Sequence, residues 1–448
     1  MNGLPKMRYH NTYMIDAVIL AGGESTRFWP FTHKILMPFF GKPLLLWHYE
    51  QLLRLGFRNV VVVANADSLT DIRFVPVPKQ MTISFANQSG RGQGHAVLAA
   101  GSLIKDKPAL ILNGSDIYED DCIRLMLDRY KKNPNDIALA AMRVTSYFPG
   151  GYLKITSHDL IGEIIEKPKK GKEPSDVVRL ALDFIPDMKA FCSVLKPFTK
   201  RPDDAYERAL SAMIKHGVES RSVMSASEWL YLKYPWHVLS VMDACLSSIQ
   251  GTTIARSVSM GKNTTIEGPV IIEEHVRIME GTKIVGPVFI GKNSIIGNNN
   301  IIRHSHIGEG CVTGFSTDIA RSYIGNNCWF HTNYIGDSVL SDNVSMGSGT
   351  VLANFRLDES PISSHVKNEL IQTGRNKLGA MIGSNVRIGV NVSIMPGVKI
   401  GKGSFIGAGV VLGEDLPDGK YCRITPTVVI SDNLKKPGQS RSEFKKNL

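Results

Sequence analysis

A glycine-rich turn follows a short apolar segment near the start of the chain, and its residue types suit the binding of phosphate. Residues 16–20 (DAVIL) have the pattern of a buried strand and run directly into AGGESTRFWP. Backbone N–H groups in such a turn are free to point at phosphate oxygens, and Gly22 and Gly23 let a ligand approach without interference from a Cβ atom. A tight turn with a purely structural role explains the same residues, so both interpretations stay open at this point.

The segments around this turn predict the sheet that must position it. Residues 59–64 (NVVVVA) and 109–113 (ALILN) read as further buried strands, and residues 44–55 have a helical pattern. Nearly continuous apolar strands that alternate with helices predict a Rossmann-like α/β domain with a doubly wound, mostly parallel sheet. Ligands of such sheets bind at the carboxyl ends of the strands.

An apolar residue recurs at every sixth position in the second half of the chain. These residues are Ile254, Met260, Ile266, Ile272, Ile278, Ile284, Ile290, Ile296 and Ile302, and later Ile382, Ile388, Ile394, Ile400, Ile406 and Leu412. A period of six fits neither the 3.6-residue spacing of a helix nor the alternation of a flat strand. It predicts short strands separated by turns that stack into a parallel β-helix with a continuous core.

Composition limits the class of protein. A chain of 448 residues exceeds one usual core, so we expect at least two domains. The sequence shows no apolar run long enough to span a membrane and no signal-peptide pattern, which predicts a cytoplasmic protein without a membrane partner. Six scattered cysteines lack CxxC spacing, so neither a zinc site nor a disulfide framework is expected.

The net charge of +11 raises the question of nucleic-acid binding. Part of this charge lies in residues 431–448, a basic tail that we expect to be disordered. No basic stripe interleaved with aromatic residues is found, so no nucleic-acid partner is predicted. Anionic small molecules explain the remaining positive charge.

Four motifs in order resemble the signature of sugar-1-phosphate nucleotidyltransferases. They are AGGESTRFWPFTHKILMPFFGKPLL, GQGHA at 92–96, NGSDIY at 113–118 and IIEKP at 164–168. The resemblance implies transfer of a nucleotidyl group, of the uridylyl or thymidylyl type, from a nucleoside triphosphate to a sugar-1-phosphate with release of pyrophosphate. Because two polyanions must meet in this reaction, cations and Mg²⁺ have to neutralise the attacking and leaving oxygens.

The resemblance also implies roles for individual residues. Arg27 would bind the β- and γ-phosphates, Lys34 would contact the α-phosphate and the sugar phosphate, and Asp116 would hold Mg²⁺. The implied nucleotide-binding residues are Leu20, Ala21, Gly22, Gly23, Gln88, Gly92 and Gln93, and the implied sugar-binding residues are Gly151 and Glu166. Solvated surface charges at Arg27 and Lys34 and a turn-capping role for Asp116 are the structural alternatives.

Three positions depart from the family pattern. Ser25 replaces a glycine of the signature, which matters little if its φ is negative. Leu153 stands where a glycine near the sugar is usual. His237, in YPWHVLS, stands where a second metal ligand, Asp or Asn, is expected, and imidazole is a poor ligand for a hard ion such as Mg²⁺.

The β-helix carries a second resemblance. WFHTNYIGDS (329–338) and GSGTVLANF (347–355) resemble the acetyltransferase half of the bifunctional glucosamine-1-phosphate acetyltransferase/N-acetylglucosamine-1-phosphate uridyltransferase, and 376–383 and 390–401 resemble its archaeal type. This resemblance implies a left-handed coil, a homotrimer and acetyl-CoA as co-substrate. His331 would be the catalytic base, and Arg303, Lys377, Tyr334 and Asn354 would bind the sugar phosphate. Ala320, Ser345 and Phe355 depart from the pattern.

The expected organisation is an N-terminal extension (1–15), a nucleotidyltransferase domain (16–248), a β-helix acetyltransferase-like domain (249–430) and the basic tail (431–448). The chain would supply nucleotide sugars such as UDP-N-acetylglucosamine. Two alternatives stay open. In one the β-helix serves only for assembly, and in the other the protein is a catalytically silent sugar-nucleotide sensor or scaffold.

Overall fold

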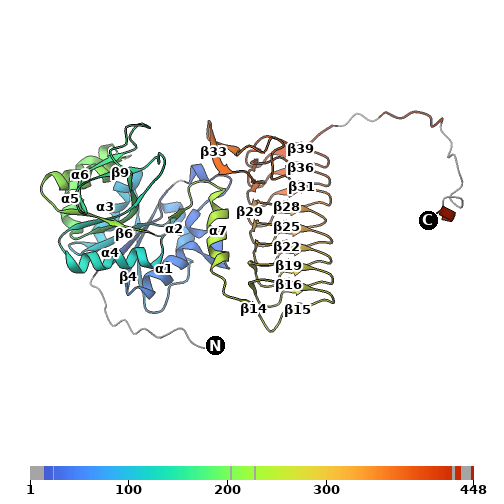
Figure 1. Cartoon of the computed structure of the whole chain (residues 1–448), viewed down its shortest axis with the longest axis horizontal. Coiled ribbons are helices and arrows are strands. Elements are labelled where there is room, and N and C mark those ends of the chain that lie inside the picture. The colour runs from blue at the N-terminus through green and yellow to red at the C-terminus, as the bar shows by residue number, and fades with distance from the viewer. Residues whose placement is uncertain are drawn as a thin grey trace.

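The computed structural model describes residues 15–23, 25–201, 204–226, 229–425, 429–434 and 445–447. The expected N-terminal extension, apart from Ile15, and most of the basic tail lie outside these residues. The described chain forms an α/β domain and a β-helix that lie side by side (Figure 1). None of the described helices has the length and apolar character needed to cross a membrane.

The α/β domain is built on one nine-stranded sheet. Its spatial order is β5 (Thr82–Asn87), β4 (Asn59–Ala64), β1 (Asp16–Leu20), β6 (Ala109–Asn113), β11 (Val177–Ile185), β8 (Ile137–Arg143), β12 (Ser220–Met224), β10 (Leu160–Glu166) and β9 (Gly151–Ser157). The first four strands are parallel, as expected. Strand β11 runs antiparallel to both of its neighbours, so the second half of the sheet is mixed.

Helices cover both faces of this sheet, because alternate residues of its strands point to opposite sides. Val60 and Val62 of β4 pack in a cluster with α1 and α4, whereas Val61 and Val63 pack with α3, α5 and α6. The helices are α1 (Leu44–Arg54), α2 (Ala66–Ile72), α3 (Gly92–Ile104), α4 (Asp120–Lys132), α5 (Met188–Leu195), α6 (Ala205–Lys215) and α7 (His237–Ser247). The predicted doubly wound, Rossmann-like architecture is therefore confirmed.

Two further pairs of short strands lie outside the main sheet. Strand β2 (Pro38–Phe39) pairs with β3 (Lys42–Pro43), and β7 (Asp116–Ile117) pairs with β13 (Leu230–Tyr231). The second pair places residues 229–233 directly beside Asp116.

The β-helix has three faces, each a sheet of parallel strands. The first face contains β14 (Thr252–Ile254), β17 (Val270–Ile272), β20 (Val288–Ile290), β23 (His306–Ile307), β26 (Tyr323–Ile324), β29 (Val339–Leu340), β34 (Met381–Ile382) and β37 (Lys399–Ile400). The second contains β15 (Ser259–Met260), β18 (Arg277–Ile278), β21 (Ile295–Ile296), β24 (Val312–Thr313), β27 (Trp329–Phe330), β30 (Ser345–Met346), β35 (Arg387–Ile388), β38 (Phe405–Ile406) and β40 (Tyr421–Cys422). The third contains β16 (Thr265–Glu267), β19 (Lys283–Val285), β22 (Ile301–Arg303), β25 (Asp318–Ala320), β28 (Tyr334–Gly336), β31 (Val351–Leu352), β36 (Ser393–Ile394) and β39 (Val411–Leu412).

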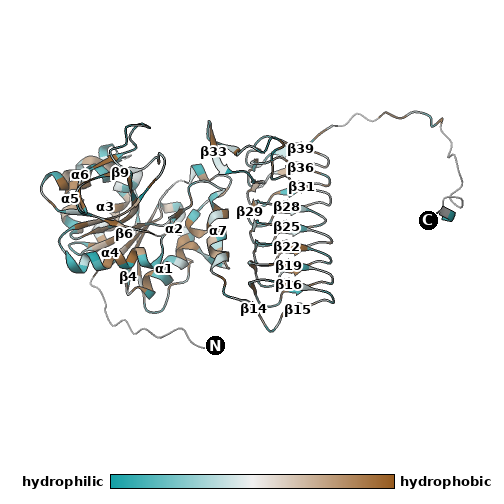
Figure 2. Cartoon of the chain, viewed as in Figure 1, coloured by the Kyte–Doolittle hydropathy of each residue, from teal (hydrophilic) through white to brown (hydrophobic). Residues whose placement is uncertain are grey.

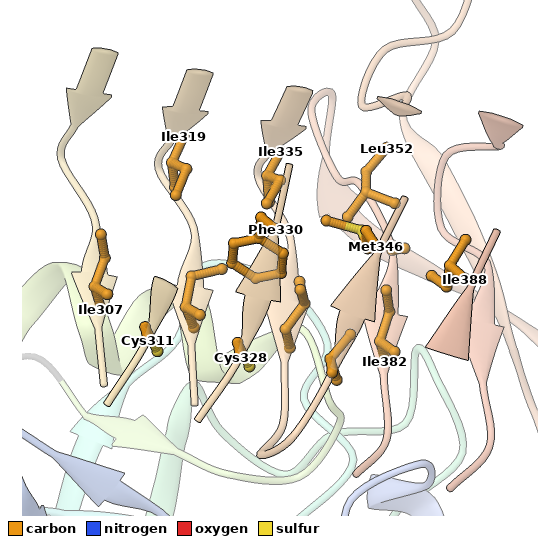
Figure 3. Packing of buried hydrophobic residues seen from close by; sticks show 14 of the residues in the cluster. Ile307, Cys311, Ile319, Cys328, Phe330, Ile335, Met346, Leu352, Ile382 and Ile388 are labelled. Atoms are coloured by element: carbon orange, nitrogen blue, oxygen red, sulfur yellow. The ribbon is translucent and has the colours of Figure 1, made fainter. Parts of the chain in front are cut away.

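The six-residue repeat places one apolar side chain per strand inside the prism. Residues of successive coils stack directly, as Ile319, Ile335 and Leu352 do (Figure 3). Met260 is the exception, because 51% of it is exposed. It lies on β15, the first strand of its sheet, where no preceding coil covers it. The predicted parallel β-helix is confirmed, and its left-handed sense stays a prediction.

The interruption of the repeat in the sequence has two structural causes. The ladder Ile272, Ile290, Ile307, Ile324 and Leu340 shows that the coils shorten from eighteen residues to seventeen and then sixteen. A hairpin of β32 (Ile362–Val366) and β33 (Glu369–Arg375) is then inserted before the regular coils resume. The coil therefore continues through the segment in which the sequence rhythm is lost.

The first face of the β-helix packs against the α/β domain. Its outward side chains Phe289, Tyr323, Val339 and Met381 are buried in one hydrophobic cluster with residues of α7 and of segment 28–44. Helix α7 lies between the two bodies and carries both hydrophobic and hydrophilic colour (Figure 2). One apolar face of α7 is thus covered by the β-helix.

His306 stands at the centre of this interface. Its ring stacks between Phe289 and Tyr323, at centroid distances of 4.9 and 4.7 Å. Nε2 accepts a hydrogen bond from the backbone N–H of Phe40 (3.1 Å), which joins the two domains. Burial lowers the pKa of His306 from 6.5 to about 4, so the imidazole is neutral at physiological pH.

We predict that the protein loses stability as the pH falls from about 6.5 to 4, and that His306→Gln reduces this loss. Within this range His306 binds a proton in the unfolded chain but not in the native state, so the free energy of unfolding falls with falling pH. The fall in Tm between pH 6.5 and 4.5 should be smaller in the variant by about 2–4 °C. Thermal unfolding across this pH range measures it.

The exposed His158 provides a matched control. His158→Gln should leave the pH profile of Tm unchanged. Identical profiles for His306→Gln and wild type would show that His306 is not the group that destabilises the interface in acid.

Candidate active sites

Three adjoining cavities open at the carboxyl ends of β1 and β6. A first cavity, of about 250 Å³, is lined by Leu20, Gly22, Gly23, Gln88, Gly92, Gln93, Ala96, Asn113 and Ala181. A second, smaller cavity of about 80 Å³ adds Ala21, Ser25 and Lys34. A third, of about 330 Å³, contains Arg27, Lys34, Asp116, Gly151 and Glu166. Asn113 lines all three, so they form one continuous cleft.

The seven predicted nucleotide-binding residues all line the first two cavities. A Cβ atom at Gly22 would come within 2.0 Å of Oε1 of Gln88, so a larger residue there would displace the Gln88 side chain. The amide of Gln88 donates to the carbonyl oxygens of Gly90 (2.6 Å) and Gly92 (3.1 Å). Gln88 therefore holds the turn at residues 90–92, while its side chain lies against Gly22.

Ser25 adopts a left-handed conformation, with φ of 51°. The condition under which this departure from the family pattern would matter little, a negative φ, is therefore not met. A residue with a Cβ atom is strained in this region, by about 1–2 kcal/mol. The loop that carries Arg27 is thus held in a conformation that glycine would adopt more readily.

Several cations surround the third cavity. Arg27, Lys34, Lys167 and Lys233 all line it. Burial, together with the charges of Arg27 and Lys233, lowers the pKa of Lys34 from 10.5 to about 8, against the opposing effect of Asp116. Burial and the charges of Arg27 and Lys167 also lower the pKa of Lys233. Because these cations repel one another, an anion in this cavity gains more than it would from any one of them alone.

Asp116 is the acidic group that faces these cations, and only 3% of it is exposed. Its carboxylate accepts hydrogen bonds from Nδ2 of Asn113 (2.7 Å) and Nε1 of Trp229 (3.2 Å). Burial raises its pKa from 3.8 to about 7, against the stabilising effect of these donors and of Lys34. A carboxylate so poorly solvated gains strongly from a bound cation.

Gly151 and Glu166, the predicted sugar-binding residues, lie together in the third cavity. A Cβ atom on Gly151 would come within 3.0 Å of Oε2 of Glu166. Leu153 is fully buried in the core on one side of the sheet, so its departure from the family pattern does not shape the cavity. Behind Glu166, Arg179 is buried in ion pairs with Asp183 and Glu207.

His237 begins α7 and does not line any of the three cavities described above. Its Nδ1 lies 3.0 Å from the carbonyl oxygen of Tyr231, and its ring contacts those of Tyr231 and Tyr234 edge-on. Burial lowers its pKa from 6.5 to about 4, so the ring is neutral. The described residues contain no group of three or more His, Cys, Asp or Glu arranged to hold a metal ion.

The β-helix has a second cluster of polar side chains, centred on Asp337. This carboxylate is buried and receives a bidentate pair of hydrogen bonds, both 2.7 Å, from Arg321. Nδ2 of Asn354 donates to Asp337 and to the hydroxyl of Tyr334 (3.3 Å). Tyr334 and Asn354, both predicted from sequence to bind the sugar, thus contact each other directly, and Asp337, which was not predicted, anchors Asn354.

The predicted cations of the β-helix lie near this cluster. Arg303 pairs through one nitrogen with both oxygens of Asp318 (2.8 and 2.9 Å), and its Nε is buried without a hydrogen-bond partner in the described structure. The strands of Arg303, Ala320 and Gly336 are neighbours in register on the third face. Lys377 is exposed and forms a bridge with Phe355, whose ring lies 5.9 Å from its Nζ.

His331 occupies the corner just before β28, which carries Tyr334. Its backbone is fixed on both sides, because its N–H donates to Oδ1 of Asn333 (2.8 Å) and its carbonyl accepts from Thr317. Its side chain is exposed, and no other described side chain hydrogen-bonds its ring. The backbone at His331 is therefore fixed, while both ring nitrogens stay accessible to a ligand.

Sequence reasoning missed Lys233, Trp229, Arg321 and Asp337. Lys233 and Trp229 reach the cleft only because β13 pairs with β7, a long-range contact without a local signal. Asp337 belongs to YIGD, directly after the predicted Tyr334, and its burial beside an arginine of the previous coil gives it its role.

Comparison with known proteins is consistent with this geometry. Residues 16–231 match the family model of nucleotidyl transferases, and residues 379–414 match that of bacterial transferase hexapeptide repeats. A bifunctional sugar-1-phosphate nucleotidylyltransferase/acetyltransferase of Sulfurisphaera tokodaii is 31% identical, over 83% of this chain and 91% of its own. The chain belongs to this family of bifunctional nucleotidylyltransferase/acetyltransferases.

A further relative and a solved structure are also similar to this chain. The bifunctional protein GlmU of Methanococcus maripaludis (strain C5) is 32% identical, over 83% of this chain and 88% of its own. Among solved structures, UDP-glucose pyrophosphorylase from Acinetobacter baumanii covers 52% of this chain and 92% of its own, at a TM-score of 0.46 and 16% identity. The family resemblance inferred from the sequence motifs is confirmed by the curated relatives.

We predict that Asp116→Asn, in the absence of divalent cations, gains stability relative to wild type as the pH rises from 5 to 8. The native state of the wild type holds a proton at Asp116 up to about pH 7 that the unfolded chain releases near pH 4, so wild-type stability falls across this range. Asparagine carries no charge to bury. The difference in Tm between variant and wild type should rise by about 4 °C or more.

Adding Mg²⁺ at pH 8 should stabilise wild type and have little effect on Asp116→Asn. Asp121→Asn, which alters an exposed carboxylate of α4, provides the control and should follow wild type in both measurements. A pH-independent difference in Tm between Asp116→Asn and wild type would show that Asp116 does not bear a buried charge.

Proposed function

We propose that this enzyme transfers a nucleotidyl group from a nucleoside triphosphate to a sugar-1-phosphate, and acetylates an amino sugar-1-phosphate from acetyl-CoA, to supply nucleotide sugars. The observation that carries the first activity is the continuous cleft in which Arg27, Lys34 and Lys233 face the buried Asp116. We place the enzyme in the cytoplasm, as a homotrimer with a left-handed β-helix.

The cleft suits an attack of a sugar phosphate oxygen on the α-phosphorus with pyrophosphate as the leaving group. The glycine loop at residues 21–23 would hold the nucleotide through backbone N–H groups, while Gly151 and Glu166 would bind the sugar. Lys34 lines both the second and the third cavity, so it is suited to contact the α-phosphate between them. Arg27 would neutralise charge that builds up on the departing pyrophosphate.

The residues present fit a divalent cation at Asp116, whose pKa is raised and whose carboxylate has only neutral donors around it. Mg²⁺ bound there would supply positive charge to the phosphate oxygens. His237 is the candidate second ligand. Its Nδ1 lies near both the carbonyl oxygen of Tyr231 (3.0 Å) and the backbone N–H of Lys233 (3.3 Å), and in the tautomer that donates from Nδ1 to Tyr231 its Nε2 would offer a lone pair to a metal. An imidazole ligand would favour Mn²⁺ or Co²⁺ more than an aspartate would.

The second activity rests on the cluster around Asp337. The amine of the acceptor must lose a proton to attack the thioester, and the exposed ring of His331 can accept that proton as the thiol of coenzyme A departs. Arg303 and Lys377 would hold the sugar phosphate, and Tyr334 and Asn354 would hold the sugar. The orphaned Nε–H of Arg303 is a donor available to a phosphate oxygen.

A homotrimer would complete this site. The second and third faces of the β-helix expose apolar side chains, including Trp329, Phe405 and Val411, that a neighbouring subunit could cover. The cluster around Asp337 lies on the third face, so a neighbour packed there would form the other wall of a cleft for acetyl-CoA.

Replacing Lys34 tests the first activity. Lys34→Ala should lower the rate of pyrophosphate release by about 10²-fold or more, the scale for removing one preorganised charge from a developing anion. The assay uses a panel of nucleoside triphosphates and sugar-1-phosphates with Mg²⁺. Lys42→Ala removes a surface ion pair with Glu50 and should leave the rate unchanged. Equal turnover in Lys34→Ala and wild type would remove Lys34 from the mechanism.

Replacing His331 tests the second activity. His331→Ala should abolish thiol release from acetyl-CoA with amino sugar-1-phosphates and leave pyrophosphate release nearly intact, because the two sites are separate. His365→Ala, on the inserted hairpin, is the control. Absence of thiol release by wild type would instead support a β-helix that serves only for assembly. A monomer in light scattering would contradict a site completed by a neighbouring subunit.

A further inference from the structure

The loop that carries Arg27 reaches across to the last coil of the β-helix. Nε1 of Trp29 donates a hydrogen bond to Oδ1 of Asp418 at 2.8 Å, although 389 positions separate them in the chain. The Nζ atom of Lys399 lies 5.6 Å from the centre of the Trp29 ring. The β-helix thus touches the nucleotidyltransferase domain two residues from Arg27.

The position of Arg27 depends on its neighbours, because its own side chain is exposed. It lies in a single 3₁₀ turn, Thr26–Phe28, that begins after the strained Ser25. Phe28 and Phe31 are buried in the hydrophobic cluster between the domains, and their rings meet edge-on at 5.5 Å. Trp29 is the third anchor, and it is the one that a hydrogen bond fixes to the β-helix.

The β-helix side of this contact is a built structure. Oδ1 of Asp418 also accepts the backbone N–H of Lys402 (3.1 Å), which orients the carboxylate. Lys399 is 2% exposed and is held by Asp415 of the last coil and by Ser364 of the inserted hairpin (3.0 Å). A hydrogen bond to such a fixed partner restricts the loop more than one to a mobile surface side chain.

We propose that the last coil of the β-helix is part of the nucleotidyltransferase site, where the Trp29–Asp418 bond positions Arg27 for the pyrophosphate end of the nucleotide. The inference rests on the proposed function of this cleft. Trp29 and Asp418 are positioning residues. The β-helix therefore contributes to the first reaction independently of its own acetyl transfer.

The reverse reaction, in which pyrophosphate attacks a nucleotide sugar, separates this role from a merely structural one. Trp29→Phe and Asp418→Ala should each raise the KM for pyrophosphate about 3–10-fold, the scale of one hydrogen bond, and leave the KM for the nucleotide sugar unchanged. The double variant should resemble either single variant, because both remove the same bond. Thiol release at the second site should stay at the wild-type rate.

Two further variants serve as comparisons. Asp418→Asn keeps an oxygen that can accept the hydrogen bond from Trp29, so its KM for pyrophosphate should stay near the wild-type value. Glu414→Gln alters an exposed carboxylate on the same coil and should have no effect. Thermal unfolding of each variant shows whether a change in KM accompanies a loss of folded protein.

An unchanged KM for pyrophosphate in Asp418→Ala, with wild type active, would overturn this inference and leave the proposed function intact. Equal increases in both KM values would also overturn it, because they would indicate general loosening of the domain. Wild-type protein that forms no nucleoside triphosphate from pyrophosphate and any nucleotide sugar of the panel would overturn the proposed function and this inference together.

Discussion

A carboxylate removed from water faces a group of cations in the cleft of the α/β domain, and the other features of that cleft depend on this arrangement. Burial destabilises the charged forms of both Asp116 and Lys34, and it therefore shifts their pKa values toward each other. Neither group is neutralised by a close ion pair with the other. The cleft therefore favours a ligand that brings both signs of charge, as a metal-bound nucleotide does.

The short strand pair β7–β13 creates this electrostatic situation. It places Trp229 over the carboxylate of Asp116 and Lys233 beside Lys34, and it leads directly into α7. The apolar side of α7 then packs on the first face of the β-helix. A continuous path of packed elements thus runs from the buried carboxylate to the second domain. The geometry of the cleft therefore depends on how the two domains pack against each other.

The sequence predicts those parts of the molecule that depend on local periodicity. The six-residue repeat indicates the β-helix because every coil repeats the same burial requirement, and Met260 fails only because it lies on the end coil. The glycine loop is also predictable from a local signal, since Gly22 and Gly23 directly follow the apolar strand at residues 16–20. Lys233 and Asp337 could not be predicted, because their roles arise from strand pairings and coil stacking that bring distant segments together. The left-handed φ of Ser25 is likewise imposed by its surroundings and not by its residue type.

The coverage of the first face of the β-helix by the α/β domain restricts how several copies of the chain can be arranged. A three-sided prism with one side occupied leaves two sides and one shared edge for contact with other copies. In a closed ring built from such prisms, the α/β domains are forced to the outer rim, away from the rotation axis. No central chamber would then enclose the nucleotide clefts, so the product would leave by diffusion and be free for consumption by other enzymes.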